Sequence, residues 1–159
     1  SKVAINNYPP RDSDISLFDF VTGDNGGSMQ AVCEYLNLWA AEADRVKDFH
    51  LLRYEDLRAN PAAELRKLLD FMQVDAADEQ VQAAVEYSSY ENMKKMESQR
   101  QFRLSGGRMV PGDKDNPDSY KVRRAKVGGY RDYFSDEEVG LIDRQLQDTL
   151  HPLFEYRPP

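Results

Sequence analysis

Only one segment of this 159-residue sequence has the pattern of a β-strand, and it is the strongest constraint on the fold. Residues 49–54, with the sequence Phe-His-Leu-Leu-Arg-Tyr, are short, largely apolar and bounded by charged residues. A single strand cannot form a sheet, because its backbone N–H and C=O groups need a neighbouring strand. We therefore expect the neighbouring strands of the sheet to come from outside this sequence.

Most of the remaining sequence has the periodicity of α-helices, with apolar residues at steps of three and four. Six segments are expected to be helical, at about 17–21, 28–46, 61–72, 78–87, 90–98 and 135–146. Ser28 and Asp78 are expected N-caps, and Ser135 with Glu138 forms a capping box. Asp56 is expected to cap the helix whose first turn contains Pro61.

Two segments lack such a pattern. Residues 1–15 are polar and proline-containing and are expected to be extended or poorly ordered, and residues 99–122 are expected to form a long loop. In the helix at 28–46, Cys33 and Trp39 are expected to be buried. His50 is expected to be structural.

Length and composition indicate one soluble globular domain, 1–159, in a reducing, cytoplasmic environment. One cysteine excludes an internal disulfide framework, and two histidines with that cysteine do not make a usual zinc site. The sequence shows no apolar run long enough for a membrane span and no signal-peptide pattern. We expect neither a metal nor a membrane partner.

The net charge of -7 is distributed unevenly. Residues 94–131 contain eleven Lys and Arg against four acidic residues, so this segment carries +7 and the remainder carries -14. Such a division predicts a local anion site on a protein that otherwise repels polyanions. It argues against nucleic-acid binding, which requires a basic surface across a domain face.

The residues from Arg123 to Tyr130 are the best candidates for that anion site. Three cations fall within four positions, Gly128 and Gly129 come next, and Arg131 closes the run. A guanidinium can donate two parallel hydrogen bonds to a phosphate or sulfate, and glycines let the backbone approach a ligand closely. The alternative is an ordinary solvated run of charge.

Four segments, in order, resemble the sulfotransferases that use 3'-phosphoadenosine 5'-phosphosulfate (PAPS). Residues 18–39 resemble the central segment of that family, and residues 52–57, Leu-Arg-Tyr-Glu-Asp-Leu with Asn-Pro shortly after, resemble its strand-to-helix signature. Residues 88–94, Ser-Ser-Tyr-Glu-Asn-Met-Lys, resemble its Thr-Ser-Phe-x-x-Met-Lys segment. Residues 123–130 resemble its Arg-Lys-Gly-x-x-Gly-Asp-Trp loop, and residues 134–138 match the family segment just after that loop.

The resemblance implies roles for six residues in binding PAPS, or PAP, the product that lacks the sulfuryl group. The adenine would be bordered by Tyr54, Ser88 and Tyr90. The 3'-phosphate would be held by Arg123, Arg124 and the amide of Ala125. The tyrosine and serine assignments have simpler alternatives, since Tyr54 and Tyr90 could be packing aromatics and Ser88 or Ser89 could be a helix N-cap.

This sequence departs from the family loop at three places. Arg124 stands where Lys is common and keeps the charge. Ala125 stands where Gly is common, which is acceptable only if its φ is negative. Gly129 and Tyr130 stand for the usual Asp-Trp pair.

The resemblance covers the C-terminal half of the family only. The N-terminal half carries the phosphate loop for the 5'-phosphosulfate and the catalytic base, and residues 8–13 lack the glycine and lysine of that loop. The implied fold class is α/β, the helix-rich C-terminal portion of a three-layer, P-loop-type sulfotransferase fold with few strands. We name no catalytic residue and expect this chain to supply only part of the donor site, inactive alone.

Other functions stay open. The chain could be a non-catalytic PAP- or nucleotide-binding or protein-interaction module of the same ancestry, whose strand pairs with the missing N-terminal half or an oligomer partner. A weaker alternative is binding of sulfated polysaccharides by the basic segment. The acceptor, a hydroxyl or an amine, is not indicated by any residue.

Overall fold

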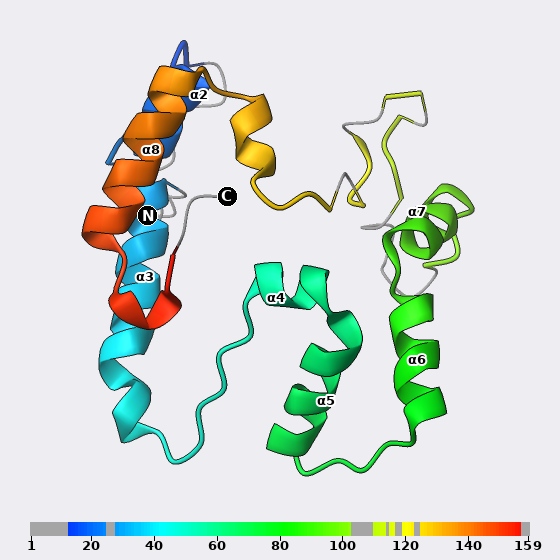
Figure 1. The fold of residues 1–159 in the computed structure, drawn as a ribbon. Coiled ribbons are helices and arrows are strands. Elements are labelled where there is room, and N and C mark those ends of the chain that lie inside the picture. Colours follow the sequence, from blue (N-terminus) through cyan, green and yellow to red (C-terminus); the bar gives the residue numbers. More distant parts are fainter. Residues whose placement is uncertain are drawn as a thin grey trace, which may run out of the picture. The chain divides into compact units, whose positions relative to one another are not determined.

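The computed structural model describes residues 13–24, 28–102, 110–113, 115–116, 119–122 and 125–156. These residues are mostly helical, as predicted, and contain no β-strand (Figure 1). No helix among them is long and apolar enough to cross a membrane. The helices and 3-10 turns are α2 (Leu17–Thr22), α3 (Met29–Glu42), η1 (Ala43–Arg45), α4 (Tyr54–Ala59), α5 (Pro61–Phe71), α6 (Asp78–Tyr87), α7 (Tyr90–Ser98), η4 (Gly129–Asp132), α8 (Asp136–Thr149) and η5 (Pro152–Phe154).

The chain divides into two compact units. The first unit combines the described parts of Ser1–Phe49 and Tyr130–Pro159, and the second consists of the described parts of His50–Gly129. In the first unit, α3 contacts both α2 and α8, and α3 and α8 lie side by side in Figure 1. Cys33, Val139 and Ile142 are buried in this unit, which confirms the prediction for Cys33.

A single amide side chain joins α3 to the end of α8. The Nδ2 of Asn37 donates to the carbonyl of Thr149 at 2.7 Å, and its Oδ1 accepts from the amide of His151 at 2.8 Å. A carbonyl in the last turn of α8 therefore has a partner that its own helix does not supply. This contact joins residues that are 112 positions apart.

Part of the apolar face of α3 stays exposed. Val32, Tyr35 and Trp39 are 51%, 60% and 46% exposed, and the rings of Tyr35 and Trp39 meet edge to face at 6.5 Å. The prediction that Trp39 is a core residue is therefore wrong for this structure. The helical periodicity is present, but α2 and α8 cover only part of the helix.

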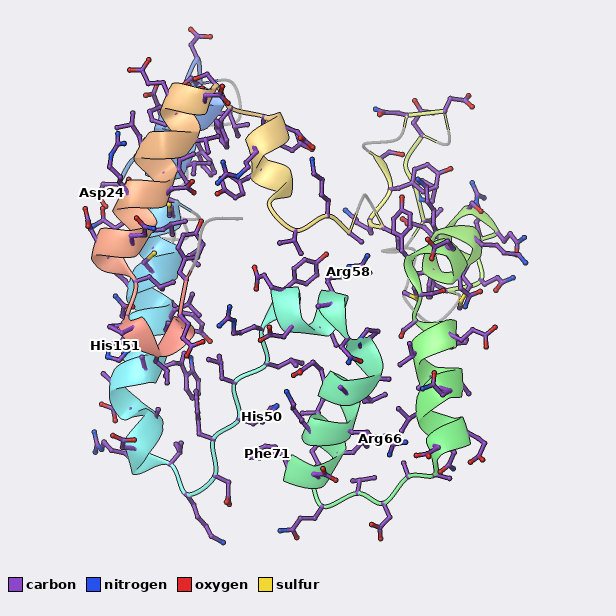
Figure 2. The ribbon with its side chains drawn as sticks, viewed as in Figure 1. Asp24, His50, Arg58, Arg66, Phe71 and His151 are labelled. Carbon is purple, nitrogen blue, oxygen red and sulfur yellow. The ribbon has the colours of Figure 1, made fainter. Side chains whose placement is uncertain are left out.

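In the second unit the helices contact one another in chain order, α4 with α5, α5 with α6, and α6 with α7. Val81 of α6 and Met96 of α7 are buried. The imidazole of His50 stacks on Phe71 at the end of α5, with ring centroids 5.2 Å apart, and Figure 2 shows the two side chains together. This packing agrees with the prediction of a structural histidine.

The predicted strand at 49–54 does not form among the described residues. Residues 49–53 have no regular secondary structure, and Tyr54 already begins α4. Arg53 has extended dihedral angles, φ -91° and ψ 139°. The local preference for extended backbone is thus met at Arg53, whereas a strand also requires a hydrogen-bonded neighbour.

Several predicted helix starts are confirmed where the signal is local. Ser28 and Ser135 cap α3 and α8, Ser135 forms the predicted capping box with Glu138, and Pro61 is the first residue of α5. Two predicted caps are wrong. The cap of α5 is Asn60, whose side chain accepts from the amide of Ala63.

Asp56 and Asp78 have other roles than the predicted ones. Asp56 lies inside α4, where its carboxylate is 3.5 Å from Nε of Arg53. Asp78 is the first residue of α6 and pairs with Arg66. An N-cap residue must directly precede the first residue of its helix. Asp56 lies one turn before the N-cap position of α5, and Asp78 lies one residue after the N-cap position of α6.

Candidate functional site

The turn between α6 and α7 contains two of the predicted adenine-bordering residues. Ser88 ends α6, and its hydroxyl donates to the carbonyl of Ala84 at 2.8 Å. Ser89 is the N-cap of α7, where its Oγ accepts from the amide of Asn92 at 3.3 Å. The N-cap alternative considered for Ser88 and Ser89 is thus confirmed for Ser89, whereas Ser88 is an exposed C-cap.

Tyr90 begins α7 and is half-buried. Its phenol oxygen accepts a hydrogen bond from Nζ of Lys94 at 3.0 Å, one turn along the helix, and the ammonium lies 5.4 Å from the ring centroid. The hydrogen bond to Tyr90 raises the pKa of Lys94 above its ordinary value. The ring is packed along its own helix and only partly covered.

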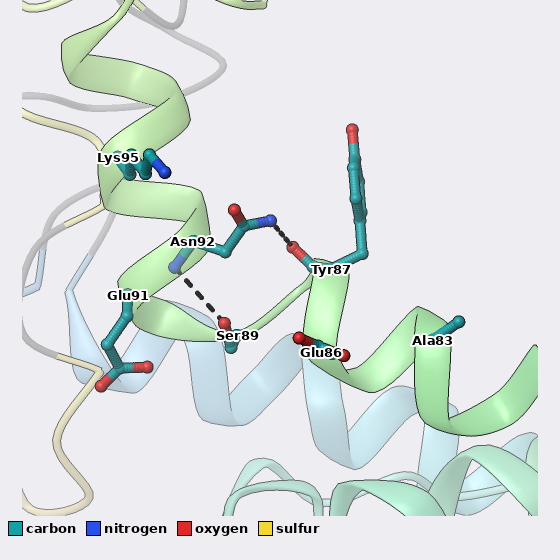
Figure 3. A pocket seen from close by; sticks show the side chains of 7 residues that line it. All are labelled: Ala83, Glu86, Tyr87, Ser89, Glu91, Asn92 and Lys95. Atoms are coloured by element: carbon teal, nitrogen blue, oxygen red, sulfur yellow. Dashed lines mark hydrogen bonds between the residues drawn. The ribbon is translucent and has the colours of Figure 1, made fainter. Parts of the chain in front are cut away.

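A hollow of about 530 Å³ lies beside this turn (Figure 3). Within it the side chain of Asn92 points to the carbonyl of Tyr87 and donates to it at 2.6 Å. Neither Ser88 nor Tyr90 lines the hollow. Its lining is Ala83, Glu86, Tyr87, Ser89, Glu91, Asn92 and Lys95. Two carboxylates against one ammonium do not suit a phosphate, so we do not place the anion site there.

Tyr54 lies at the start of α4 and is 47% exposed. Because α4, α5, α6 and α7 contact one another in series, Tyr54 and Tyr90 lie at the two ends of that series. The exposure of the Tyr54 ring disfavours its alternative role as a core aromatic. An exposed aromatic ring can stack on a planar ligand.

A buried carboxylate that the sequence prediction does not single out leads to the basic loop. Glu97, in the last turn of α7, has no exposed surface. Its carboxylate accepts hydrogen bonds from two consecutive backbone amides, Lys121 at 2.6 Å and Val122 at 2.8 Å. The chain just before Arg123 is thereby held against α7. Arg123 and Arg124 themselves lie outside the described residues.

The backbone after the two arginines adopts left-handed conformations. Ala125 has φ 47° and Gly128 has φ 67°. The condition under which alanine would be an acceptable replacement for glycine, a negative φ, is therefore not met at Ala125. A left-handed conformation suits glycine and costs a non-glycine residue, such as the alanine here, about 1–2 kcal/mol.

The other end of the basic segment is fixed in the first unit by a second carboxylate, Asp143 of α8. Its Oδ1 accepts from the phenol of Tyr130 at 2.5 Å and from that of Tyr156 at 3.2 Å. Its Oδ2 accepts from a guanidinium N–H of Arg131 at 2.7 Å. Three donors from two separate parts of the chain thus converge on one side chain.

Burial raises the pKa of both tyrosines in this cluster. For Tyr130 the hydrogen bond to Asp143 is the next cause, and for Tyr156 it is the hydrogen bond shared with Tyr130. Both phenols are therefore neutral donors over the physiological range. The cluster is a hydrogen-bonded anchor rather than a proton-transfer site.

The described residues contain no group of three or more His, Cys, Asp or Glu that could hold a metal ion. The groups of the second unit that suit an anionic ligand are its cationic side chains and backbone amides. The structure brings Ser88 and Tyr90 into one turn, and hydrogen bonds to Glu97 fix the two residues before Arg123. It leaves Tyr54 at the far end of the helix series.

Comparison with known proteins gives a consistent family. The sulfotransferase domain model matches residues 13–154. Cytosolic sulfotransferase 16 of Arabidopsis thaliana is 28% identical over an alignment of 130 residues that covers 72% of this chain and 35% of that protein. Flavonol 4'-sulfotransferase of Flaveria chlorifolia is 24% identical over an alignment of 120 residues that covers 72% of this chain and 36% of that protein.

Sulfotransferase 2A6 of Mus musculus is 20% identical over 117 residues, which cover 74% of this chain and 39% of that protein. The chain thus spans little more than a third of the length of these relatives. No solved structure matches it. Since the family match extends over nearly the whole chain, from the start of the described residues to η5, the chain belongs to the sulfotransferase family.

Proposed function

We propose that this chain supplies the adenine and 3'-phosphate part of a PAPS-binding site in a sulfotransferase. The observation that carries the proposal is the family match over residues 13–154, which includes the basic segment and the α6–α7 turn. The hydrogen bonds from the amides of Lys121 and Val122, just before the arginines, to the buried carboxylate of Glu97 support a specific role for this segment rather than a solvated run of charge.

In this proposal Arg123 and Arg124 hold the 3'-phosphate through charge-assisted hydrogen bonds, and the amide of Ala125 adds a third donor. Tyr54, Ser88 and Tyr90 border the adenine. The hydroxyl of Ser88 already donates to Ala84, so any contact to the donor would use its free lone pairs. No residue of this chain is proposed as the catalytic base, and no metal takes part.

Calorimetric titration with PAP tests this assignment. We expect the chain to bind PAP, and Arg123→Ala to weaken binding by about ten- to a hundredfold, as expected for loss of a charged hydrogen-bonding partner. Arg58→Ala is the matched control, because Arg58 is an exposed cation on α4 of the same unit (Figure 2). Equal losses in both variants would indicate non-specific charge attraction and contradict the assignment.

We further propose that the chain alone does not transfer sulfate, because in-line transfer also requires the phosphosulfate end of the donor to be held. A radiolabelled-PAPS assay with phenolic, alcohol and amine acceptors should show no product above background. Transfer to any acceptor by the isolated chain would overturn this part of the proposal.

Relatives that carry "cytosolic" in their names support the expectation of a cytoplasmic protein.

A binding module that needs a partner is the second candidate. Phe49 and Leu52, in the segment with the strand-like sequence, are 37% and 36% exposed, and residues 49–53 are in no strand among the described residues. An extended segment with exposed apolar side chains can pair with an added strand. Sedimentation velocity would detect self-association, and Leu52→Lys should abolish it. Heparin binding without PAP binding would instead support a polysaccharide ligand.

A further inference from the structure

Glu97 is the most completely buried ionisable side chain among the described residues, with 0% exposure. Burial of a carboxylate is unfavourable unless hydrogen bonds replace the lost water. Its place in the last turn of α7 adds to the cost, because the C-terminal end of a helix carries a partial negative charge. A charge in so unfavourable a place calls for a specific partner.

That partner is a pair of adjacent backbone amides far along the chain. Lys121 and Val122 donate at 2.6 and 2.8 Å, one to each carboxylate oxygen, over separations of 24 and 25 residues. Amide bonds to an ionised carboxylate are shorter and stronger than those between neutral groups. Two of them to one carboxylate fix the orientation of the connecting peptide as well as its position.

The fixed peptide ends where the basic pair begins, since Val122 directly precedes Arg123. Beyond the arginines, left-handed residues at 125 and 128 turn the chain. A bidentate guanidinium needs defined geometry, and a loop that is ordered before the ligand arrives loses less entropy on binding.

We propose that Glu97 is the positioning residue of the 3'-phosphate site, acting through Lys121 and Val122 without touching the donor. This inference rests on the proposed function of the basic loop. This role accounts for an acidic side chain within the most basic segment of the protein. The Glu97 carboxylate is buried and hydrogen-bonded to two backbone amides, so it does not face the bound anion.

Two variants and one control test the proposal. Glu97→Gln keeps the shape but replaces one acceptor oxygen with an NH₂ group, and Glu97→Asp keeps the charge but withdraws it by one methylene. Glu79→Gln, at an exposed position in the first turn of α6, removes a carboxylate elsewhere in the same unit. For each, PAP affinity is measured by calorimetry, and the Lys121 and Val122 amides are followed by NMR hydrogen exchange without ligand.

We expect Glu97→Gln to weaken PAP binding by about tenfold, as the loss of one charged hydrogen bond implies. Protection of the two amides should fall in step with affinity across wild type, Glu97→Asp and Glu97→Gln, while amides of α6 keep their protection. Glu79→Gln should match wild type in both measurements. If Glu97→Gln does not fold, the Asp variant carries the test.

Unchanged or tighter PAP binding together with lost amide protection would overturn the inference. Tighter binding would show that the carboxylate competes with the phosphate for these amides. Weaker binding with full amide protection would also overturn it, because Glu97 would then act by another route. Absence of PAP binding in the wild-type chain would overturn the proposed function itself, and the inference with it.

Discussion

Two carboxylates flank the basic loop, and they are satisfied in different ways. Glu97 lies in the second unit, is completely buried and accepts only backbone amides in the contacts described. Asp143 lies in the first unit, has a side chain that is 14% exposed, and accepts from two phenols and a guanidinium. The first anchor therefore fixes a backbone, and the second fixes side chains that can be replaced one at a time.

The largest effect is expected when the backbone anchor is removed. Glu97→Ala should destabilise the second unit by about 3 kcal/mol, because two amides lose a charged acceptor and a cavity remains. Urea unfolding followed by far-UV circular dichroism measures the change. Neutral surface substitutions change the unfolding free energy by up to roughly 0.5 kcal/mol. A change no larger than that for Glu97→Ala would show that the Glu97 anchor does not stabilise the second unit.

Removal of the side-chain anchor should cost less. Asp143→Ala is expected to lower the unfolding free energy by about 2 kcal/mol. The phenols of Tyr130 and Tyr156 lie 3.3 Å apart and can still bond to each other, and Arg131, 36% exposed, can turn to water. The same urea titration ranks the two variants. A larger loss for Asp143→Ala than for Glu97→Ala would reverse the comparison.

Alkaline pH should weaken the tyrosine anchor at Asp143. Tyr130 and Tyr156 have folded pKa values raised above the ordinary 10.0, so the folded state holds their protons after the unfolded state has lost them. Their contribution is fully present below pH 10 and is lost as the pH rises above it.

Tyr156→Phe isolates this effect, because phenylalanine has no proton to lose. The gap in unfolding free energy between wild type and Tyr156→Phe should change by about 1.4 kcal/mol from about pH 8 to about pH 11, to the disadvantage of wild type. Denaturant titrations at both pH values, with Tyr87→Phe at an exposed position as control, measure it. A constant gap would mean that Tyr156 titrates normally.

The smallest effect concerns the backbone between the anchors. Ala125→Gly should stabilise the protein by about 0.5 kcal/mol, because relief of the left-handed alanine slightly exceeds the added freedom of the unfolded chain. Thermal unfolding should show a small rise in Tm. A fall would show that residue 125 does not adopt a positive φ in solution.

The sequence is most informative about features that depend on neighbours in the chain. Ser28, Pro61 and Ser135 mark helix starts through contacts within one turn, and the structure confirms them. The assignment of the α5 cap to Asp56 is wrong although Asn60 directly precedes Pro61 and has a capping side chain. That error is avoidable, because position relative to the first turn decides between two capping residue types.

Features that depend on distant partners are not predictable in the same way. The segment at 49–53 has strand-like residues, but a ladder depends on a second strand that no local pattern supplies. Glu97 gives only a weak signal, an acid at a helix end within a basic segment. Its partners are amides, which every residue except proline has, so no residue type could identify them.

The long-range contact of Asn37 has a consequence for the order of synthesis. Asn37 can form its hydrogen bond only after Thr149, 112 residues later, has been synthesised. At cellular translation rates the interval between the two residues is roughly 6 to 22 s. Through that interval α3 cannot pair with α8, whereas the described α-helices of the second unit, Tyr54 to Ser98, are all synthesised before α8. The nascent first unit is thus the part of this protein that we expect chaperones to shield.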